Sequence, residues 1–371
     1  MKVALVHDYL IQDGGAERVL LALYELFPQA PIFTLFYDPE RTHPGFRGAT
    51  IIPSYLNKRT FAPRHYQWYL PFMAQAVESF DLSPFDLVIS NASSFAKGVI
   101  VAPHATHICY CHTPTRFLWQ DRLGYVNDLP QPQLIKSILP RFLHRLRQWD
   151  RLAAERPDVL VTNSAISQRR IRRYYQRDAR VIFPPVDVEH IPLSPHAGQF
   201  WLAGGRLVAY KKFDLIVRAF SKLDQPLKIF GAGPEEKKLR ALAGPRTEFV
   251  GRVDEATKID LYQHAIGFVH PQVEDFGITA VEAMAAGKPV IAHAHGGAEE
   301  TVKEGVTGRY LSVQCWQDIA EAVLRFDPSL YDPTQIRAHA QQFSKGVFLN
   351  QIQSLIDQTL RVPGSEFRSN L

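Results

Sequence analysis

The residues best suited to do chemistry lie in the segment Glu274-Asp275-Phe276-Gly277-Ile278-Thr279-Ala280-Val281-Glu282. Gly277 allows a tight turn, and the backbone N–H groups of residues 277–279 then form a helix N-terminus, which attracts a phosphate or a sugar hydroxyl. Glu282 follows in an apolar helix, where a buried carboxylate needs a partner and can accept both hydroxyls of a ribose. Two glutamates at this spacing also occur on ordinary surface helices, so the spacing alone does not show that they form a binding site.

A second cluster of candidates is the basic segment Gly205-Arg206-Leu207-Val208-Ala209-Tyr210-Lys211-Lys212. Arg206 closes a predicted strand, and Lys211 lies just before a predicted helix. Arginine supplies a fork of donors and lysine a point charge, so the pair suits a pyrophosphate. The alternative is a solvated basic turn. Near the start of the chain, Gly14-Gly15 likewise lets backbone N–H groups approach an anion at a helix N-terminus.

A third candidate is His112, in the segment Cys109-Tyr110-Cys111-His112-Thr113-Pro114. Strand alternation puts Cys109 and Cys111 on one face and His112 on the other, and no second pair of ligands follows, so we expect no zinc. The nearest approach to an Asp-x-Asp metal motif is Asp187-Val188-Glu189. A histidine after a strand also has a purely structural interpretation.

Short apolar runs alternate along the chain with segments of helical period. We therefore expect alternating strands and helices to position these candidates. The predicted strands of the first half are residues 2–7, 31–35, 86–91, 106–111 and 158–163. A proline-rich break at 184–198 indicates a linker, and a second series then begins at Phe200, with strands predicted at 227–231, 248–251, 267–270 and 289–293. The pattern predicts two facing doubly wound α/β domains with ligands bound in the cleft between them, outside the carboxyl ends of the strands.

The composition is that of a globular protein and argues against a disulfide-rich or membrane-spanning one. The chain has 371 residues, 46% hydrophobic and 21% charged, as expected for a globular protein of two domains. Three cysteines are too few for a disulfide scaffold, and no apolar run reaches membrane-spanning length. The opening apolar run is too short for a signal peptide, so we expect a cytoplasmic protein, either free or peripheral on the membrane.

The net charge of +5 resides in residues 1–190, with 22 basic and 17 acidic residues. Residues 116–180 alone carry 14 basic and 6 acidic residues, which indicates either solvated helix faces or a surface for anionic partners. No zinc-finger, RNP-like or basic-zipper motif is present, so we do not expect a nucleic-acid partner.

Taken together, these segments resemble the family 4 retaining glycosyltransferases of GT-B fold over nearly the whole chain. The ordered motifs that carry the resemblance are Gly14-Gly15-Ala16-Glu17, Pro184-Pro185-Val186-Asp187, Gly205-Arg206 with Lys211, Phe230-Gly231-Ala232-Gly233-Pro234, Glu274 with Glu282, and Gly296-Gly297-Ala298-Glu299-Glu300. The implied organisation is an N-terminal acceptor-side domain 1–183, a linker 184–198, a nucleotide-sugar-binding domain 199–343, a C-terminal helix 344–361 that packs back on the N-terminal domain, and a tail or vector-derived remnant 362–371.

The resemblance also implies roles. Arg206 and Lys211 would bind the donor diphosphate, Glu274 the transferred hexose and Glu282 the ribose, while His112 would lie beside the donor sugar. The expected catalytic set is His112, Glu274, Arg206 and Lys211, and the expected donor-binding set adds Gly14, Gly15, Gly231, Val253, Phe276, Gly277, Ile278, Thr279 and Glu282. One departure is Lys212, where many members have glycine. The implied reaction is retaining and needs no metal or cofactor, because cations and helix dipoles stabilise the leaving diphosphate.

We also expect a particular donor and a particular acceptor. The segments His7-Asp8-Tyr9-Leu10 and 111–119 are similar to a bacterial subgroup that builds surface polysaccharides, often with GDP-mannose, so we expect mannosyl transfer. The aromatic and basic stretches 55–73 and 141–151 suit an anionic membrane surface, which favours a lipid-linked oligosaccharide acceptor. The alternatives are another donor such as UDP-glucose or UDP-GlcNAc, a GT-B nucleotide-sugar epimerase, or a non-catalytic adaptor that binds sugar nucleotides.

Overall fold

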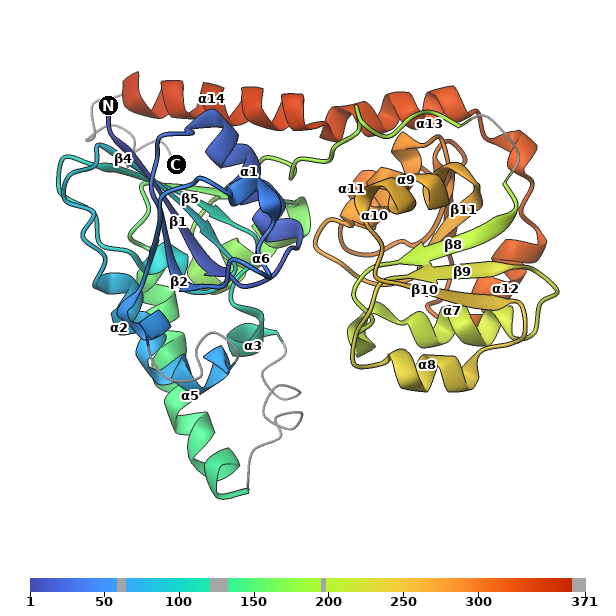
Figure 1. Ribbon diagram of the computed structural model, residues 1–371, viewed down its shortest axis with the longest axis horizontal. Coiled ribbons are helices and arrows are strands. Elements are labelled where there is room, and N and C mark those ends of the chain that lie inside the picture. The colour runs from blue at the N-terminus through green and yellow to red at the C-terminus, as the bar shows by residue number, and fades with distance from the viewer. Residues whose placement is uncertain (59–64, 121–132, 195–197, 362–371) are drawn as a thin grey trace. The chain divides into compact units, whose positions relative to one another are not determined.

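A computed structural model describes residues 1–58, 65–120, 133–194 and 198–361, with the backbone alone for 133–138. The chain divides into two compact units, one formed by residues 1–183 with the C-terminal segment from Leu349, the other by residues 184–348. Each unit holds one parallel sheet with helices on both faces (Figure 1). Both units are therefore doubly wound, as the alternating sequence pattern predicts.

The sheet of the first unit has seven strands in the order β3-β2-β1-β4-β5-β6-β7, and every neighbouring pair is parallel. The strands are β1 (Val3–Leu10), β2 (Ile32–Tyr37), β3 (Ile51–Pro53), β4 (Leu87–Ala92), β5 (Thr106–Cys111), β6 (Val159–Thr162) and β7 (Arg180–Val181). The central strands are buried at almost every position, because helices cover both faces of the sheet.

Asp8 corrects the predicted end of the first strand. We expected a loop from Asp8 onward, yet β1 continues to Leu10. The Asp8 carboxylate accepts hydrogen bonds from the backbone N–H groups of residues 93–96, all at 2.6–2.7 Å. A carboxylate satisfied in this way can stay inside a buried strand, and it fixes the turn after β4 beside the end of β1.

The helices of the first unit separate into two layers. α1 (Gly15–Leu26) contacts β1 and β4, while α2 (Leu70–Glu78) and α5 (Gln133–Ala153) share one hydrophobic core on the other face (Figure 1). That core combines the alternate strand residues Val6, Leu35 and Val88 with Met73 and Leu146 from the helices. Two further helices of this unit are α3 (Arg116–Trp119) and α6 (Ala165–Tyr175). No helix among the described residues is both long and apolar enough to cross a membrane.

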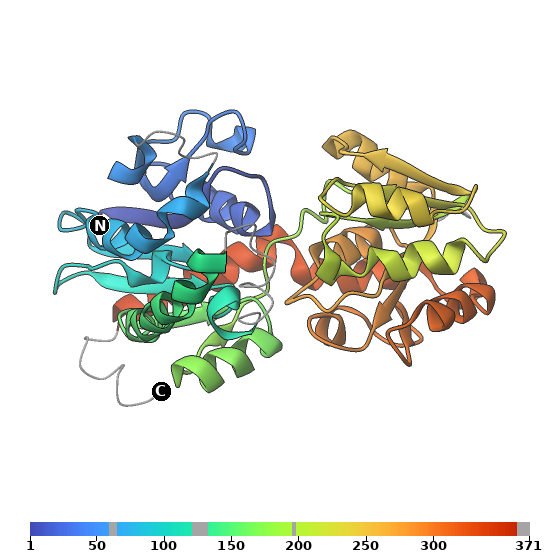
Figure 2. The same cartoon turned by 90° about the horizontal axis from the view of Figure 1, so that it is seen from below.

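The second unit repeats the design with six parallel strands in the order β10-β9-β8-β11-β12-β13. These are β8 (Phe200–Gly204), β9 (Leu227–Phe230), β10 (Thr247–Gly251), β11 (Ala265–His270), β12 (Val290–His293) and β13 (Gly308–Leu311). One face packs against α7 (Phe213–Phe220), α8 (Glu236–Leu242) and α12 (Trp316–Leu324), seen from below in Figure 2. The other face carries α9 (Glu255–Gln263), α10 (Ile278–Ala285), α11 (Ala298–Thr301) and α13 (Pro333–Ala340).

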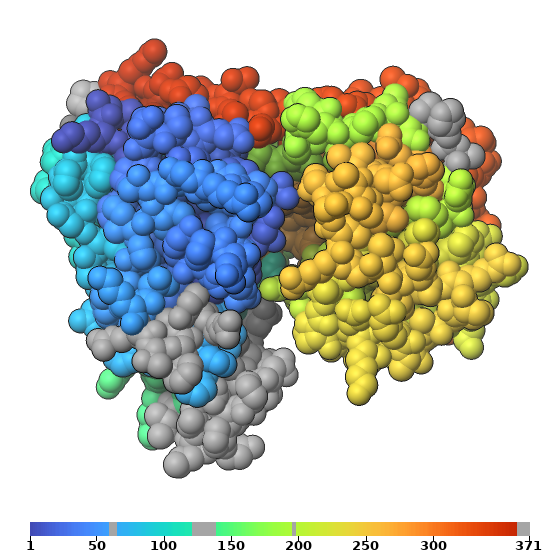
Figure 3. Space-filling model, viewed as in Figure 1, coloured from blue at the N-terminus to red at the C-terminus, as the bar shows by residue number. Residues whose placement is uncertain are grey.

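The described part of the expected linker is packed against the second unit. Val186 and Val188 are 1% and 0% exposed, and the backbone of Val186 hydrogen-bonds to Phe343 and Lys345. The last helix, α14 (Lys345–Arg361), joins the first unit from Leu349, where Gln358 accepts a hydrogen bond from Arg180 at 3.0 Å. Figure 3 shows this red helix on the surface of the first unit. Residues 362–371, expected as a tail, lie outside the described residues.

Candidate functional site

Gly205, Gly231 and Gly233 form the base of the site in the second unit, which we call the glycine floor. Gly205 follows β8 and Gly231 follows β9, and both have positive φ angles, 130° and 110°. A Cβ atom at Gly231 would lie 1.9 Å from the carbonyl oxygen of Gly205, and one at Gly233 would lie 2.2 Å from that of Leu207. Only glycine allows this contact between backbones, so the motif joins the carboxyl ends of two neighbouring strands.

The two cations, Arg206 and Lys211, follow Gly205 in the chain. Arg206 lies two residues beyond β8, past the end of the strand that it was expected to close, and its side chain is exposed. Lys211 ends a short 3₁₀ helix, Ala209–Lys211, and its Nζ would lie 3.0 Å from a Cβ atom at Gly205. Lys212 then takes a left-handed conformation with φ 56°, which explains why glycine suits that position. The turn thereby aims Lys211 back over the glycine floor.

Glu274 meets Lys211 directly. Its Oε1 lies 2.7 Å from the Lys211 Nζ, and its Oε2 lies 3.8 Å from the Nε2 of His270, at the end of β11. Burial lowers the pKa of His270 to about 4, against the opposing effect of the Glu274 charge. Because the Gln272 amide nitrogen donates to His270 Nδ1 at 2.8 Å, the neutral ring carries its proton on Nε2, facing Glu274. The carboxylate is therefore paired with the Lys211 charge, and the neutral His270 ring lies beside it beyond hydrogen-bond distance.

The late glycine pair supports the loop that carries Glu274. Gly297 donates its backbone N–H to the Glu274 carbonyl at 2.8 Å. A Cβ atom at Gly296 would lie 2.4 Å from that same carbonyl oxygen, and one at Gly297 would lie 2.3 Å from the Cα of Phe276. Phe276 is buried, with its ring 5.4 Å from that of Phe343. The loop is thus fixed from beneath, which keeps Glu274 in place.

The other glutamate of the motif has different partners. Glu282 lies on α10, where its Oε1 is 2.7 Å from Lys258 Nζ and its Oε2 accepts from the Tyr262 hydroxyl at 2.9 Å. Both partners come from α9. Burial alone lowers the pKa of Lys258, but the charge and hydrogen bonds of Glu282 and Glu255 raise it above its ordinary value. The contacts from Lys258 and Tyr262 therefore fix the orientation of the Glu282 carboxylate.

The remaining candidates of this unit lie around the start of α10. Gly277 caps the helix with φ 94°, so its N–H and those of Ile278 and Thr279 are the first of the helix. The Thr279 hydroxyl oxygen is buried and has no hydrogen-bond partner among the described residues, which leaves it available to a ligand. Val253 is half-buried just after β10.

The first unit brings its own candidates together around Asn91. Gly14 caps α1, Gly15 is its first residue, and the Ala16 carbonyl accepts from the Asn91 amide nitrogen at 2.7 Å. The Asn91 amide oxygen accepts from Nε2 of His112, which directly follows β5, at 2.7 Å. Cys109 and Cys111 are buried free thiols, and burial raises the pKa of Cys109 to about 12. Within the described parts of the chain, no three His, Cys, Asp or Glu residues are grouped as metal ligands.

Sequence reasoning missed the residues that orient the site: Asn91, Lys258, Tyr262 and His270. Each contacts a recognised residue from another element, and nothing in the spacing of the chain marks that contact. The one available signal was the apolar setting of Glu282, which implied a partner without naming it.

Two family models match consecutive parts of the chain. The model of "Glycosyltransferase Family 4" matches residues 13–190, and that of "Glycosyl transferases group 1" matches residues 191–329. The chain belongs to the family 4 glycosyltransferases. The glycine floor, the two cations and the two glutamates all lie within the part of the chain that the second model matches.

Curated relatives of this chain include the D-rhamnosyltransferase WbpZ of Pseudomonas aeruginosa, 30% identical over 43% of this chain and 44% of that protein. Another is the mannosylfructose-phosphate synthase of Agrobacterium fabrum, 27% identical over 54% of this chain and 52% of that protein. The chain thus spans about half the length of these relatives.

Solved structures cover the chain more fully. Anabaena HepE in complex with UDP and glucose has a TM-score of 0.72 at 18% identity, covering 96% of this chain and 99% of that one. The sucrose-phosphate synthase of Thermosynechococcus elongatus also gives 0.72 at 19% identity, with the same coverages. These likenesses show that the two units have the GT-B fold.

Proposed function

We propose that the protein transfers a hexose from a nucleotide diphosphate-sugar to a glycan acceptor with retention of configuration. The observation that carries the proposal is the contact between Lys211 and Glu274 over the glycine floor, with Nζ and Oε1 2.7 Å apart. One residue suits a diphosphate and the other a sugar hydroxyl, and the two groups are joined in such a donor. Membership of the family supports the same conclusion.

The chemistry follows from where charge develops. As the bond from the sugar to the diphosphate breaks, negative charge grows on the leaving oxygen. Arg206, Lys211 and the N–H groups at the start of α10 are the groups that would stabilise it. The acceptor hydroxyl would attack from the face of the leaving group and give its proton to the leaving phosphate oxygen. This reaction uses no metal and no enzymic nucleophile, so Glu274 positions the sugar.

We further propose GDP-mannose as the donor and a lipid-linked oligosaccharide at the cytoplasmic face of the membrane as the acceptor. The sequence similarity to a bacterial polysaccharide subgroup favours this choice. Relatives named for rhamnosyl transfer and for mannosylfructose phosphate are consistent with a deoxyhexose or mannose donor. The roles of His112 and Gly15, both in the first unit, belong to the same proposal.

The test is nucleotide release from GDP-mannose, UDP-glucose, UDP-GlcNAc and ADP-glucose, with calorimetry for binding. We expect slow GDP release from GDP-mannose, lost in Lys211→Ala and kept in Lys212→Gly, which removes the adjacent charge at a position whose backbone favours glycine. Release from another donor would replace the mannosyl assignment. An isomerised sugar nucleotide without release would indicate an epimerase, and absence of both binding and release would indicate an adaptor. Binding without release calls for lipid-linked glycans as acceptors.

A further inference from the structure

One side-chain amide in the first unit joins two segments that the sequence marks separately. Asn91, on β4, is buried, and its Nδ2 donates to the Ala16 carbonyl in the first turn of α1 at 2.7 Å. Its Oδ1 lies 2.7 Å from Nε2 of His112. Because a carbonyl can only accept, the contact with Ala16 fixes which end of the amide is nitrogen, and the oxygen must face His112.

The orientation of the amide determines the protonation of the histidine. An amide oxygen has no proton to give, so His112 Nε2 must carry the proton in that hydrogen bond. A neutral His112 ring therefore has its acceptor lone pair on Nδ1. The ring is also in contact with Tyr110, with centroids 5.1 Å apart at 67°. Asn91 thus selects one tautomer and one ring direction.

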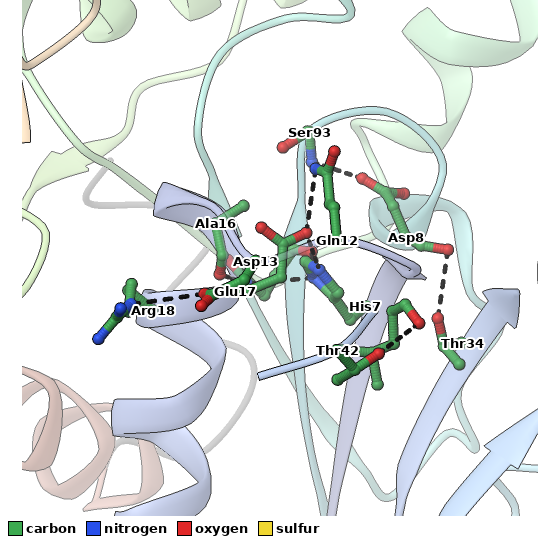
Figure 4. A network of polar contacts seen from close by, with 12 residues as sticks. His7, Asp8, Gln12, Asp13, Ala16, Glu17, Arg18, Thr34, Thr42 and Ser93 are labelled. Atoms are coloured by element: carbon green, nitrogen blue, oxygen red, sulfur yellow. Dashed lines mark hydrogen bonds and ion pairs between the residues drawn. The ribbon is translucent and has the colours of Figure 1, made fainter. Parts of the chain in front are cut away.

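Asn91 is itself held by a buried ion pair, drawn in Figure 4. His7 Nδ1 donates to the Asn91 backbone carbonyl at 3.0 Å, and His7 Nε2 lies 3.4 Å from Glu17 Oε1. The Gln12 amide donates to the same Glu17 oxygen at 3.2 Å. Both members of the pair are 2% exposed, so β1, β4 and the first turn of α1 are locked together around Asn91.

We propose that Asn91 is a positioning residue for sugar transfer, which presents His112 to the donor in a single tautomer and couples its orientation to the glycine loop before α1. The proposal rests on the proposed function, which gives His112 its role at the donor sugar. Asn91 touches neither donor nor acceptor in this scheme. Its effect passes through the hydrogen bonds of its amide to His112 and to the Ala16 carbonyl.

The first arm of the test reads the tautomer without any substrate. The full-length protein is labelled with ¹⁵N-histidine, and the His112 signals are assigned by their loss in His112→Gln. We expect the Nε2–H pattern in the wild type and in Asn91→Asp, which keeps an acceptor. We expect a mixture of tautomers in Asn91→Ala. Retention of the pure Nε2–H pattern in Asn91→Ala would overturn the proposal.

The second arm reads turnover of the best donor. Asn91→Ala should lower kcat by about 5- to 10-fold, about the net worth of one hydrogen bond between uncharged groups, with KM for the donor nearly unchanged. Asn91→Asp should recover part of the loss. Asn57→Ala is the matched control, because its amide oxygen accepts from Tyr37 N at 2.9 Å at the end of β2, two strands away from β4 in the same sheet. Parallel changes in KM and melting temperature, with no rescue by Asp, would instead indicate a structural role and overturn the proposal.

The two arms also separate this proposal from the proposed function. If the wild type releases nucleotide from no donor and no acceptor restores turnover, the proposed function fails. The ¹⁵N measurement still decides whether Asn91 sets the His112 tautomer, and a mixed tautomer in the wild type overturns the assignment of Asn91 as a positioning residue.

Discussion

Lys211 and Glu274 form an ion pair, with Nζ and Oε1 2.7 Å apart and side chains only 12% and 15% exposed. A diphosphate that binds Lys211 must therefore share the ammonium with a carboxylate that is already present. The attraction between unlike charges at this distance is appreciable in a partly buried site. Donor binding consequently exchanges one partner of Lys211 for another, or adds to it.

The first prediction concerns the two members of this pair. Lys211→Ala should weaken binding of a nucleoside diphosphate by about 10- to 100-fold, because one charge-assisted hydrogen bond is lost. Glu274→Gln should strengthen binding of the same diphosphate, because the competing charge is gone, and yet slow sugar transfer. Calorimetry and turnover measure the two effects. Weaker diphosphate binding in Glu274→Gln would show that the carboxylate does not compete for Lys211.

The second prediction concerns the orientation of Glu282. The Tyr262 hydroxyl donates to Oε2 and Lys258 pairs with Oε1, and both contacts orient the carboxylate that we propose accepts the two ribose hydroxyls. Tyr262→Phe should weaken binding of a ribose nucleotide by roughly 5- to 10-fold, about the net worth of one hydrogen bond. Binding of the matching 2′-deoxy nucleotide should change less. Equal losses for both nucleotides would place Glu282 away from the ribose.

The sequence predicts the central strands well, because each is a short apolar run covered on both faces. The strands it misses are the short ones β3, β7 and β13, the last with the polar Arg309 within it. All three are edge strands, and β3 and β7 are only three and two residues long, too short for an alternating pattern to be recognised. The site residues also fall into two groups. Sequence motifs point to Lys211 and Glu274, whereas the contact between Asn91 and His112 depends on which strands become neighbours, and that is a property of the fold.

The third prediction concerns stability at acid pH. Burial lowers the pKa of His107 to about 3 and that of His270 to about 4, both below the ordinary value of 6.5. Between pH 6.5 and about 4 the folded protein keeps both rings neutral while the unfolded chain protonates them. The unfolded state therefore binds more protons in this range. As the pH is lowered, the free energy of unfolding falls by about 1.4 kcal/mol per pH unit for each histidine.

Two variants isolate this effect. His107→Gln, which removes the imidazole that contacts the Ser90 hydroxyl at 2.8 Å, should flatten the loss of stability between pH 6.5 and 4, although it lowers stability at neutral pH. His104→Gln, at an exposed position nearby, serves as the control and should leave the slope of the wild type. Denaturant unfolding at several pH values gives the slopes. Identical slopes for both variants would exclude His107 as a source of the acid sensitivity.

The last prediction concerns the surface expected to meet a membrane. Trp68 and Phe72 are 69% and 51% exposed on a 3₁₀ turn and α2, which packs against α5. Arg141 and Arg145 are exposed on α5, while Arg59 and Arg64 lie outside the described residues. Aromatic side chains beside cations are the combination that binds an anionic lipid surface.

Sedimentation with lipid vesicles tests this surface. We expect the protein to bind vesicles containing phosphatidylserine, to bind pure phosphatidylcholine much less, and to dissociate as salt rises, since exposed charges are screened. Replacing Trp68 and Phe72 together by serine should lower binding by about tenfold or more, because two large apolar side chains no longer leave water. The matched control replaces Leu324 and Leu330, which are 68% and 72% exposed in the second unit. If the control pair lowers binding as much as the aromatic pair, the contact is nonspecific and the proposed membrane surface is wrong.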